Sequence, residues 1–305
     1  MKKTFYSNGK LLITGEYLVL DGAKAFALPT KFGQNLNVEE GENQEFSWKS
    51  YNEDGTIWFQ DTIPFSEIIN PIIAATPSVK STLITILNEA YKMQPAFINT
   101  SKGYQITTEL SFPKKWGLGT SSTLINNIAQ WLQIDAFELL KTSFGGSGYD
   151  IACAQNDSPI TYQLQKGKSK VENIKFRPDF TDAIYFIYLN KKQNSKTAIA
   201  NYQNNKAEDI EKSIITINKL TTEVLQAKAV TSFGHALEKH EAEMSYVLET
   251  STVKESLFSD FNGQVKSLGA WGGDFVMVVS EVNPKTYFNS KGFNTILTYD
   301  EMILK

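Results

Sequence analysis

The sequence predicts a globular protein that mixes strands with helices and divides into two domains. Hydrophobic residues make up 41% of the 305 residues and charged residues 21%, a balance typical of a chain that folds around a packed core. Hydrophobic residues alternate as in strands through most of the first third and recur at helical spacing in several later segments. The lysine-rich stretch 166–175 has a solvated character, so we place the boundary there and expect domains at 1–165 and 166–305.

The first part of the chain is expected to contain strands, one helix and a polar loop. Asp21-Gly22 is a turn signal that ends an apolar run, and Asn52–Gly55 is the turn of a hairpin. The expected elements, in order, are strands at 11–13, 17–20, about 46–48 and 56–59, a helix at 78–93, a strand at 104–111 and a loop at 113–120.

Helices and two strands are expected after this loop. Residues 183–189 are apolar without interruption, as in a strand buried on both faces. The expected elements are a helix from about Ser121, helices at 136–142 and near Tyr149, the strand at 183–189, two or three helices between 197 and 258, and a strand at 275–279.

Charge and composition argue against several classes of function. The formal net charge of −3 gives no reason to expect a nucleic-acid partner. Cys153 is the only cysteine, which excludes an intrachain disulfide, and the spacing of His235 and His240 does not suit a zinc pair on one helix face. Neither a membrane span of about 18 apolar residues nor a secretory signal pattern is present, so we expect a cytoplasmic protein with no membrane partner.

The polar loop has the chemistry of a phosphate site. Glycines let backbone N–H groups approach an anion, and a helix N-terminus adds about half a positive charge. A serine hydroxyl in the first helical turn offers an oxygen to Mg²⁺ or phosphate. An ordinary loop before a capped helix explains the same residues equally well, because serine and threonine favour caps. The candidate phosphate-binding residues are Gly117, Leu118, Gly119, Thr120, Ser121 and Ser122.

Two common nucleotide motifs are absent. The Gly167-Lys168-Ser169 segment has Tyr162 at the position where a Walker A loop needs glycine. No loop after an expected strand carries the GxGxxG fingerprint of dinucleotide-binding proteins. Any nucleotide is therefore held by a different kind of loop.

Four segments together resemble the GHMP kinases, a family that includes galactokinase, homoserine kinase, mevalonate kinase and phosphomevalonate kinase. They are the loop 117–122, the Gly-Lys-x-x-x-x-Gly-Glu-Tyr segment 9–17, the Gly-Tyr-Asp-Ile-Ala segment 148–152 and the glycine motif 266–273. The Gly-Tyr-Asp-Ile-Ala segment is similar to the hallmark of a bacterial subgroup (GYDIA) and is closest to the mevalonate and phosphomevalonate kinases. The resemblance implies an α+β, two-domain GHMP kinase fold, with a ribosomal protein S5 domain 2-like N-terminal domain and a ferredoxin-like C-terminal domain.

The resemblance also implies roles for individual residues. Asp150 matches the base that takes the proton of the acceptor hydroxyl, and Lys10 matches the lysine beside it. Ser121 matches a hydroxyl that ligates Mg²⁺. Glu138 is the nearest match to a second Mg²⁺ ligand, although it falls one position away in a gapless comparison. ATP and Mg²⁺ are the implied cofactors.

Three aromatic residues depart from the family pattern. Trp116 precedes the phosphate loop where a small residue is usual, Trp271 replaces a glycine of the last motif, and Tyr17 replaces a histidine of the first. The two indoles either line a nucleotide or acceptor pocket or pack against each other.

The implied reaction is transfer of the γ-phosphoryl group of ATP to a small hydroxylated or phosphorylated acid. We expect mevalonate or phosphomevalonate in isoprenoid precursor synthesis, with Lys191, Lys192 and Lys196 as candidate cationic partners of the acceptor. The alternatives are a diphosphomevalonate decarboxylase-like lyase, a kinase for a sugar or homoserine, and a non-catalytic ligand sensor. A homodimer remains open.

Overall fold

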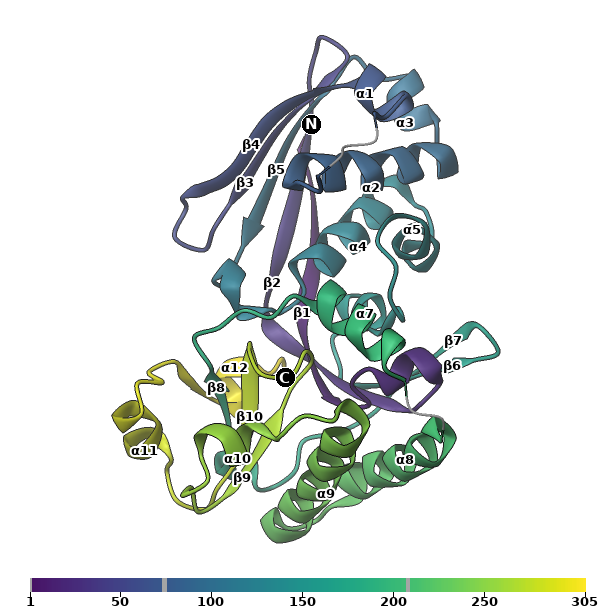
Figure 1. The fold of residues 1–305 in the computed structure, drawn as a ribbon. Coiled ribbons are helices and arrows are strands. Elements are labelled where there is room, and N and C mark those ends of the chain that lie inside the picture. The colour runs from purple at the N-terminus through teal and green to yellow at the C-terminus, as the bar shows by residue number, and fades with distance from the viewer. Residues whose placement is uncertain (1, 73–75, 207–208) are drawn as a thin grey trace. The chain divides into compact units, whose positions relative to one another are not determined.

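The structure is a computed structural model that describes residues 2–72, 76–206 and 209–305 (Figure 1). Contacts divide the chain into two compact units, each assembled from separate segments. The first unit comprises Met1–Gly9, Phe32–Lys114 and Leu118–Gln155; the second comprises Lys10–Lys31, Lys115–Gly117 and Asn156–Lys305. The predicted domain limits of 1–165 and 166–305 stay a prediction, because compactness does not test which segments fold independently.

The first unit is built on strands in the order β4-β3-β5-β2. β3 and β4 form the predicted antiparallel hairpin, β3 runs parallel to β5, and β5 runs antiparallel to β2. Phe46, Trp48 and Ser50 are buried and alternate with partly exposed neighbours, so one face of β3 lies in the core. The strands are β2 (Ala25–Glu40), β3 (Glu45–Tyr51), β4 (Ile57–Pro64), β5 (Tyr104–Leu110) and β1 (Lys3–Thr14), which pairs with β2; β1 and β2 both continue into the second unit.

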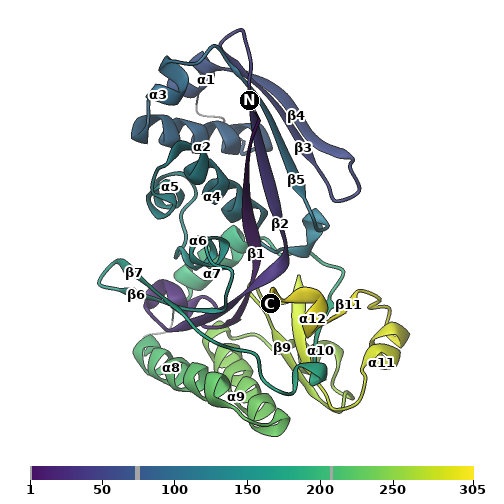
Figure 2. The same cartoon turned by 180° about the vertical axis from the view of Figure 1, so that it is seen from behind.

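Helices of the first unit cover one face of this sheet (Figures 1 and 2). The hydroxyl of Ser78 caps α2, as expected of the predicted helix at 78–93. In the core the Phe46 ring stacks on Tyr104 at 5.2 Å between centroids, and Trp131 of α4 meets Tyr104 edge-on at 4.9 Å. The helices are α1 (Phe65–Ile69), α2 (Val79–Met93), α3 (Ala96–Asn99), α4 (Thr120–Leu132), α5 (Ala136–Ser143) and α6 (Tyr149–Ala154). A 3₁₀ turn at Lys114–Trp116 begins with the last residue of one segment of this unit and continues in the second unit.

The second unit contains an antiparallel sheet in the order β11-β8-β10-β9. Its strands are β8 (Ile184–Tyr188), β9 (Gln264–Ser267), β10 (Phe275–Val279) and β11 (Ile296–Thr298). Every residue of β8 and β10 is buried, which agrees with the uninterrupted apolar run predicted for the first of them. A hairpin of β6 (Ile160–Gln165) and β7 (Lys168–Asn173) lies outside this sheet and pairs through β6 with residues 25–27 of β2. It contains most of the lysine-rich stretch, and β7 is largely exposed.

Four described helices, rather than the predicted two or three, lie between 197 and 258 or overlap that range. Periodicity does not reveal the short α10 (Val253–Leu257), which depends on a capping box of Thr252 and Glu255. The others are α7 (Ser195–Asn204), α8 (Ile210–Gln226) and α9 (Val230–Leu248); α11 (Lys285–Ser290) and α12 (Tyr299–Met302) follow. Within the described residues, no helix has the length and apolar character that crossing a membrane requires.

The predicted strand at 17–20 is wrong. Leu18–Asp21 is a 3₁₀ helix, and Gly22 ends it in the left-handed conformation at φ 90°. Tyr17 has φ 56°, which interrupts the extended chain, and the N–H of Val19 then bonds to the carbonyl of Gly15 at 2.9 Å. Leu18 is fully buried in a cluster with α8 and α9 residues, so tertiary packing overrides the strand preference of this apolar run.

Candidate active site

The phosphate-loop candidates of the first unit form the start of α4. Gly119 is the N-cap residue of this helix and has left-handed geometry, with φ 98° and ψ 39°. No side chain caps this helix end. An anion could therefore bind at the N-terminus of this 13-residue helix, because the glycine leaves room for it to approach the free backbone N–H groups.

The hydroxyls in the first turn of α4 have different environments. Ser122 is buried and donates to the carbonyl of Gly119 at 2.9 Å, so its hydroxyl is used within the helix. Ser121 is half-buried. The hydroxyl oxygen of Thr120 is buried and has no hydrogen-bond partner among the described residues. A buried polar atom that lacks a partner is costly, so a ligand oxygen at this position would satisfy it.

Asp150 lies in the first turn of α6, which follows the left-handed Gly148 at φ 93°. This carboxylate is half-buried. α6 packs against α4, and the side chain of Gln155 at its end donates to Asn126 of α4 at 3.1 Å. Ile151 is fully buried in the core of the first unit and fixes the helix there. The structure therefore brings the helix of Asp150 beside the helix of Ser121.

Glu138 lies on the surface of the first unit. It occupies the first turn of α5, where Asp135 caps the helix, and its carboxylate pairs with Lys141 at 3.8 Å. Among the described residues, no group of three or more histidine, cysteine or acidic side chains is arranged to hold a metal ion. A Mg²⁺ ligand role for Glu138 stays a prediction.

Lys10 and Gly117 belong to the second unit and are in contact. The Lys10 ammonium donates to the carbonyl of Gly117 at 3.4 Å, and Lys10 is half-buried. Gly117 has φ 72°, a conformation that favours glycine. Lys10 and Gly117 come from two of the four segments that resemble the family and are more than 100 residues apart in the sequence. The fold brings them into contact.

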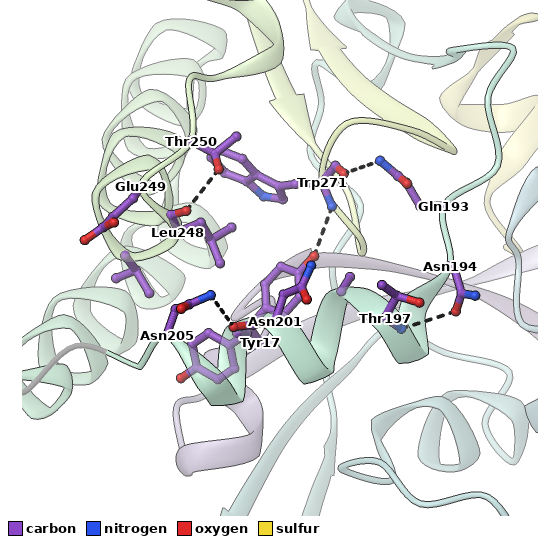
Figure 3. A pocket seen from close by; sticks show the side chains of 13 residues that line it. Tyr17, Gln193, Asn194, Thr197, Asn201, Asn205, Leu248, Glu249, Thr250 and Trp271 are labelled. Atoms are coloured by element: carbon purple, nitrogen blue, oxygen red, sulfur yellow. Dashed lines mark hydrogen bonds between the residues drawn. The ribbon is translucent and has the colours of Figure 1, made fainter.

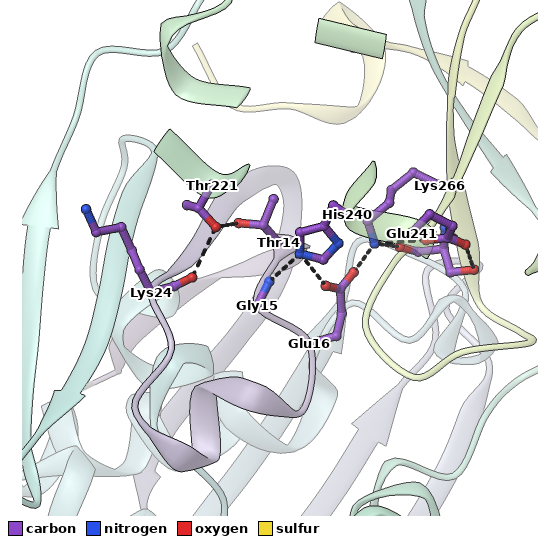
Figure 4. A network of polar contacts seen from close by, with 9 residues as sticks. Thr14, Gly15, Glu16, Lys24, Thr221, His240, Glu241 and Lys266 are labelled. Atoms are coloured by element: carbon purple, nitrogen blue, oxygen red, sulfur yellow. Dashed lines mark hydrogen bonds and ion pairs between the residues drawn. The ribbon is translucent and has the colours of Figure 1, made fainter. Parts of the chain in front are cut away.

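A buried network of charges joins Glu16 to the last glycine motif (Figure 4). The Lys266 ammonium is an ion-pair partner of Glu16 and lies 3.3 Å from a carboxylate oxygen of Glu241. Glu241 also accepts from the N–H and hydroxyl of Ser267 at 3.0 and 2.7 Å. His240, fully buried, accepts the N–H of Gly15 at 3.1 Å. The network fixes the Gly15-Glu16 segment to α9 and β9.

The charges of this network do not balance, since two carboxylates share one ammonium. Burial raises the pKa of Glu16 to about 7, although the ion pair with Lys266 opposes the rise. Burial alone would lower the pKa of Lys266, but the two carboxylates raise it above its usual value. Burial and the Lys266 charge hold the pKa of His240 well below its usual value, so the imidazole is neutral.

A cavity of about 480 Å³ lies in the second unit (Figure 3). The backbone N–H of Trp271 donates there to the hydroxyl of Tyr17 at 3.3 Å, and the side-chain amide of Gln193 donates to the backbone carbonyl of Trp271 at 2.7 Å. The indole N–H of Trp271 is buried and finds no hydrogen-bond partner in the part of the chain that the structure describes. The lining residues are Tyr17, Gln193, Asn194, Thr197, Ala198, Asn201, Tyr202, Asn205, Val247, Leu248, Glu249, Thr250 and Trp271.

This lining is rich in neutral hydrogen-bonding groups. Four carboxamides contribute, together with tyrosine and threonine hydroxyls, and Glu249 is the single carboxylate among the described residues that line the cavity. Neither the cluster of Lys191 and Lys192 nor Lys196 is among them, although α7 itself forms one wall. Trp271 therefore lines this cavity, whereas the Trp116 ring packs edge-on against Phe275 at 5.4 Å. That either indole lines a nucleotide or acceptor pocket stays a prediction.

Sequence reasoning missed several residues of these sites. Lys266 stood in a recognised motif but received no role, and Glu241 and Tyr202 lie on helices that carried no motif. Asp274 directly follows the glycine motif 266–273. An acidic residue immediately after two glycines could have been recognised in the sequence as a candidate site residue.

Solved structures with the same fold were found across the full length of the chain. The mevalonate kinase of Methanococcus jannaschii has a TM-score of 0.72 and 16% identity over 100% of this chain and 99% of its own. The phosphomevalonate kinase of Streptococcus pneumoniae, in complex with phosphomevalonate and AMPPNP, has a TM-score of 0.70 and 14% identity, covering 97% and 99%. The galactokinase of Lactococcus lactis, complexed with galactose, has a TM-score of 0.65 and 14% identity, covering 95% and 88%.

These similarities confirm the predicted α+β GHMP kinase fold. No family model matches the sequence, and no curated protein matches it either. Because all three identities are 16% or lower, the similarity establishes the fold and leaves the activity to be argued from the residues.

Proposed function

We propose that this protein is an ATP-dependent kinase that transfers the γ-phosphoryl group of ATP to a hydroxyl or phosphate oxygen of a small molecule. The observation that carries the proposal is the start of α4, where the left-handed Gly119 and the unpartnered hydroxyl of Thr120 precede a helix packed against that of Asp150. The fold neighbours are consistent with this chemistry, since they are mevalonate, phosphomevalonate and sugar kinases.

The residues present fit ATP and Mg²⁺. The helix N-terminus of α4 and the hydroxyl of Thr120 suit phosphate oxygens. Mg²⁺ commonly takes only one or two protein oxygens in addition to phosphate and water, so the lack of a larger acidic cluster among the described residues is no obstacle. Ser121 and Glu138 would supply those oxygens, and the ion would neutralise charge on the phosphates.

In the proposed reaction the acceptor oxygen forms a bond to the γ-phosphorus, and the bond from that phosphorus to the β–γ bridging oxygen breaks, releasing ADP. Asp150 takes the proton of the acceptor hydroxyl. Lys10 offers positive charge to the phosphoryl group during transfer. The backbone of 117–122 holds the phosphates in position.

For the acceptor we propose mevalonate or phosphomevalonate. Support comes from the Gly-Tyr-Asp-Ile-Ala segment at 148–152 and from mevalonate and phosphomevalonate kinases among the fold neighbours. The cavity bounded by Tyr17 and Trp271 is the proposed acceptor pocket. A carboxylate held there would be bound by carboxamide and hydroxyl donors, because the described residues that line the cavity include no lysine or arginine.

The same lining favours a second candidate, a kinase for a neutral sugar-like acceptor. Carboxamides, hydroxyls and the faces of aromatic rings are the groups that recognise an uncharged polyol. The buried indole N–H of Trp271 would gain an acceptor from a ligand hydroxyl.

A coupled ADP-release assay across mevalonate, phosphomevalonate, homoserine, galactose and a heptose phosphate tests these proposals. The favoured result is a preference of at least tenfold in kcat/KM for mevalonate or phosphomevalonate, about 1.4 kcal/mol of discrimination. A tenfold preference for a neutral sugar supports the second candidate and contradicts the first. Carbon dioxide and inorganic phosphate as products identify a decarboxylase, and binding without turnover identifies a sensor.

A further inference from the structure

Asp274 adopts a backbone conformation that side chains rarely take. Its φ is 52°, in the left-handed region, and it follows Gly272 and Gly273 at the start of β10. Two backbone bonds hold it there: its N–H donates to the carbonyl of Lys191 at 2.7 Å, and its carbonyl accepts the N–H of Leu189 at 2.8 Å. Glycine would suit this position better, so the presence of aspartate calls for a reason in its side chain.

The carboxyl group of Asp274 lies directly against Gly117. A Cβ added to Gly117 would come within 2.4 Å of the carboxyl carbon, so only glycine allows this approach. The carbonyl of the same glycine accepts the ammonium of Lys10 at 3.4 Å. Gly117 is therefore in contact with both side chains. The backbone N–H of Gln193 donates to the Asp274 carboxylate at 3.2 Å and helps to fix it.

The charges around this carboxylate favour its ionised form, against its burial. Burial raises the pKa of Asp274, while the Gln193 N–H and the positive charges of Lys10 and Lys192 oppose the rise. One carboxylate thus stands near two ammonium groups. Both lysine charges therefore act on the carboxyl group that lies against Gly117.

We propose that Asp274 is a positioning residue that holds the Lys10 ammonium and the Gly117 backbone in the arrangement needed for phosphoryl transfer. The inference rests on the proposed function, because it assumes that Lys10 acts on the phosphoryl group. A merely structural aspartate would only tie its loop to Gln193. The two roles predict different effects of Asp274→Gly on kcat and on thermal stability.

Asp274→Gly is the first test, with thermal stability and steady-state kinetics measured together. Glycine suits the left-handed backbone, so the melting temperature should stay unchanged or rise by a few degrees. The kcat should nevertheless fall by about 10–100-fold, the range for residues that orient an active group, with a smaller change in the KM for ATP. Asp274→Asn, which keeps the shape and loses the charge, should show the same loss of kcat.

Lys166→Gly is the matched control. Lys166 is also a charged residue with a left-handed φ, 50°, but it lies exposed in the turn of the β6–β7 hairpin. This variant should keep the wild-type kcat. If Asp274→Gly melts well below the wild type, or keeps its kcat, the positioning role is wrong.

A double-mutant cycle with Lys10→Met separates this inference from the proposed function. Lys10→Met alone should lower kcat by about 10²–10³-fold. In that background Asp274→Asn should cost less than about twofold, because the residue through which it acts is gone. If the kcat losses of the two single variants multiply in the double variant, the proposed role of Asp274 is wrong, while the proposed function is unaffected. A Lys10→Met variant with wild-type kcat overturns the proposed role of Lys10 and this inference with it.

Discussion

Replacing Lys266 with methionine should destabilise the second unit strongly. Its side chain is 1% exposed, and its ammonium is shared by the buried carboxylates of Glu16 and Glu241. Methionine has a similar length but no charge, so both carboxylates would stay buried without a cation. Removing one partner from a buried ion pair typically costs about 3–5 kcal/mol. For a unit of this size such a loss lowers the melting temperature by on the order of 10 °C.

The cost should depend on pH in a defined direction. The folded pKa of Glu16 is raised to about 7 from its usual 4.5, so the stability that its protonated form contributes is complete below 4.5 and is lost as the pH rises through 7. Without Lys266 the Glu16 carboxyl ionises less readily in the folded state, which steepens this loss. The destabilisation by Lys266→Met should therefore be larger at pH 8 than at pH 5.5.

Thermal and urea unfolding of wild type and variant at these two pH values measure the effect. Lys219→Met is the control, because Lys219 is exposed on α8 and its pair with Glu223 at 3.8 Å is worth less than about 1 kcal/mol. A Lys266→Met variant as stable as Lys219→Met at pH 8 would refute the reasoning. An equal cost at both pH values would refute the assigned pKa direction.

Three further predictions concern the proposed reaction. Asp150→Asn should leave folding and ATP binding intact and lower kcat by about 10²–10⁴-fold, because it removes the general base; a variant that keeps a third of wild-type turnover, with chemistry rate-limiting, contradicts that role. Ser121→Ala should raise the Mg²⁺ concentration needed for activity at fixed ATP more than it changes acceptor affinity, and an unaltered Mg²⁺ titration would leave Ser121 a purely structural residue. Trp271→Phe should raise the KM for the acceptor by about 3–10-fold, as for one lost hydrogen bond, with little change in kcat; an unchanged KM would place the acceptor outside this cavity.

Much of the fold was predictable because its signals are local. The capping serine and apolar spacing of α2 determine that helix within 16 residues, and the alternation of Phe46 and Trp48 determines β3. The glycines of the loop 117–122 likewise allow the left-handed conformation that Gly119 adopts before α4. The fold itself was predicted from the resemblance of four segments, in the same order, to the GHMP kinases. Hydrophobic periodicity alone does not specify how the helices and strands are arranged.

The parts that failed or were missed depend on contacts between distant segments. Residues 17–20 form a 3₁₀ helix because Leu18 packs against helices near residues 217 and 244, and local propensity contains no information on that packing. Glu16 and Lys266 pair across 250 positions. A single sequence identifies both as charged residues and gives no reason to bury them together.

Transfer of label from [γ-³²P]ATP is the most direct test of the central claim, that this protein is a kinase with Asp150 as its base. Wild type should move the label to an organic acceptor and release unlabelled ADP, and Asp150→Asn should do so about 10²-fold or more slowly while still binding ATP. Label found only in inorganic phosphate, or equal transfer by the variant, would contradict the account.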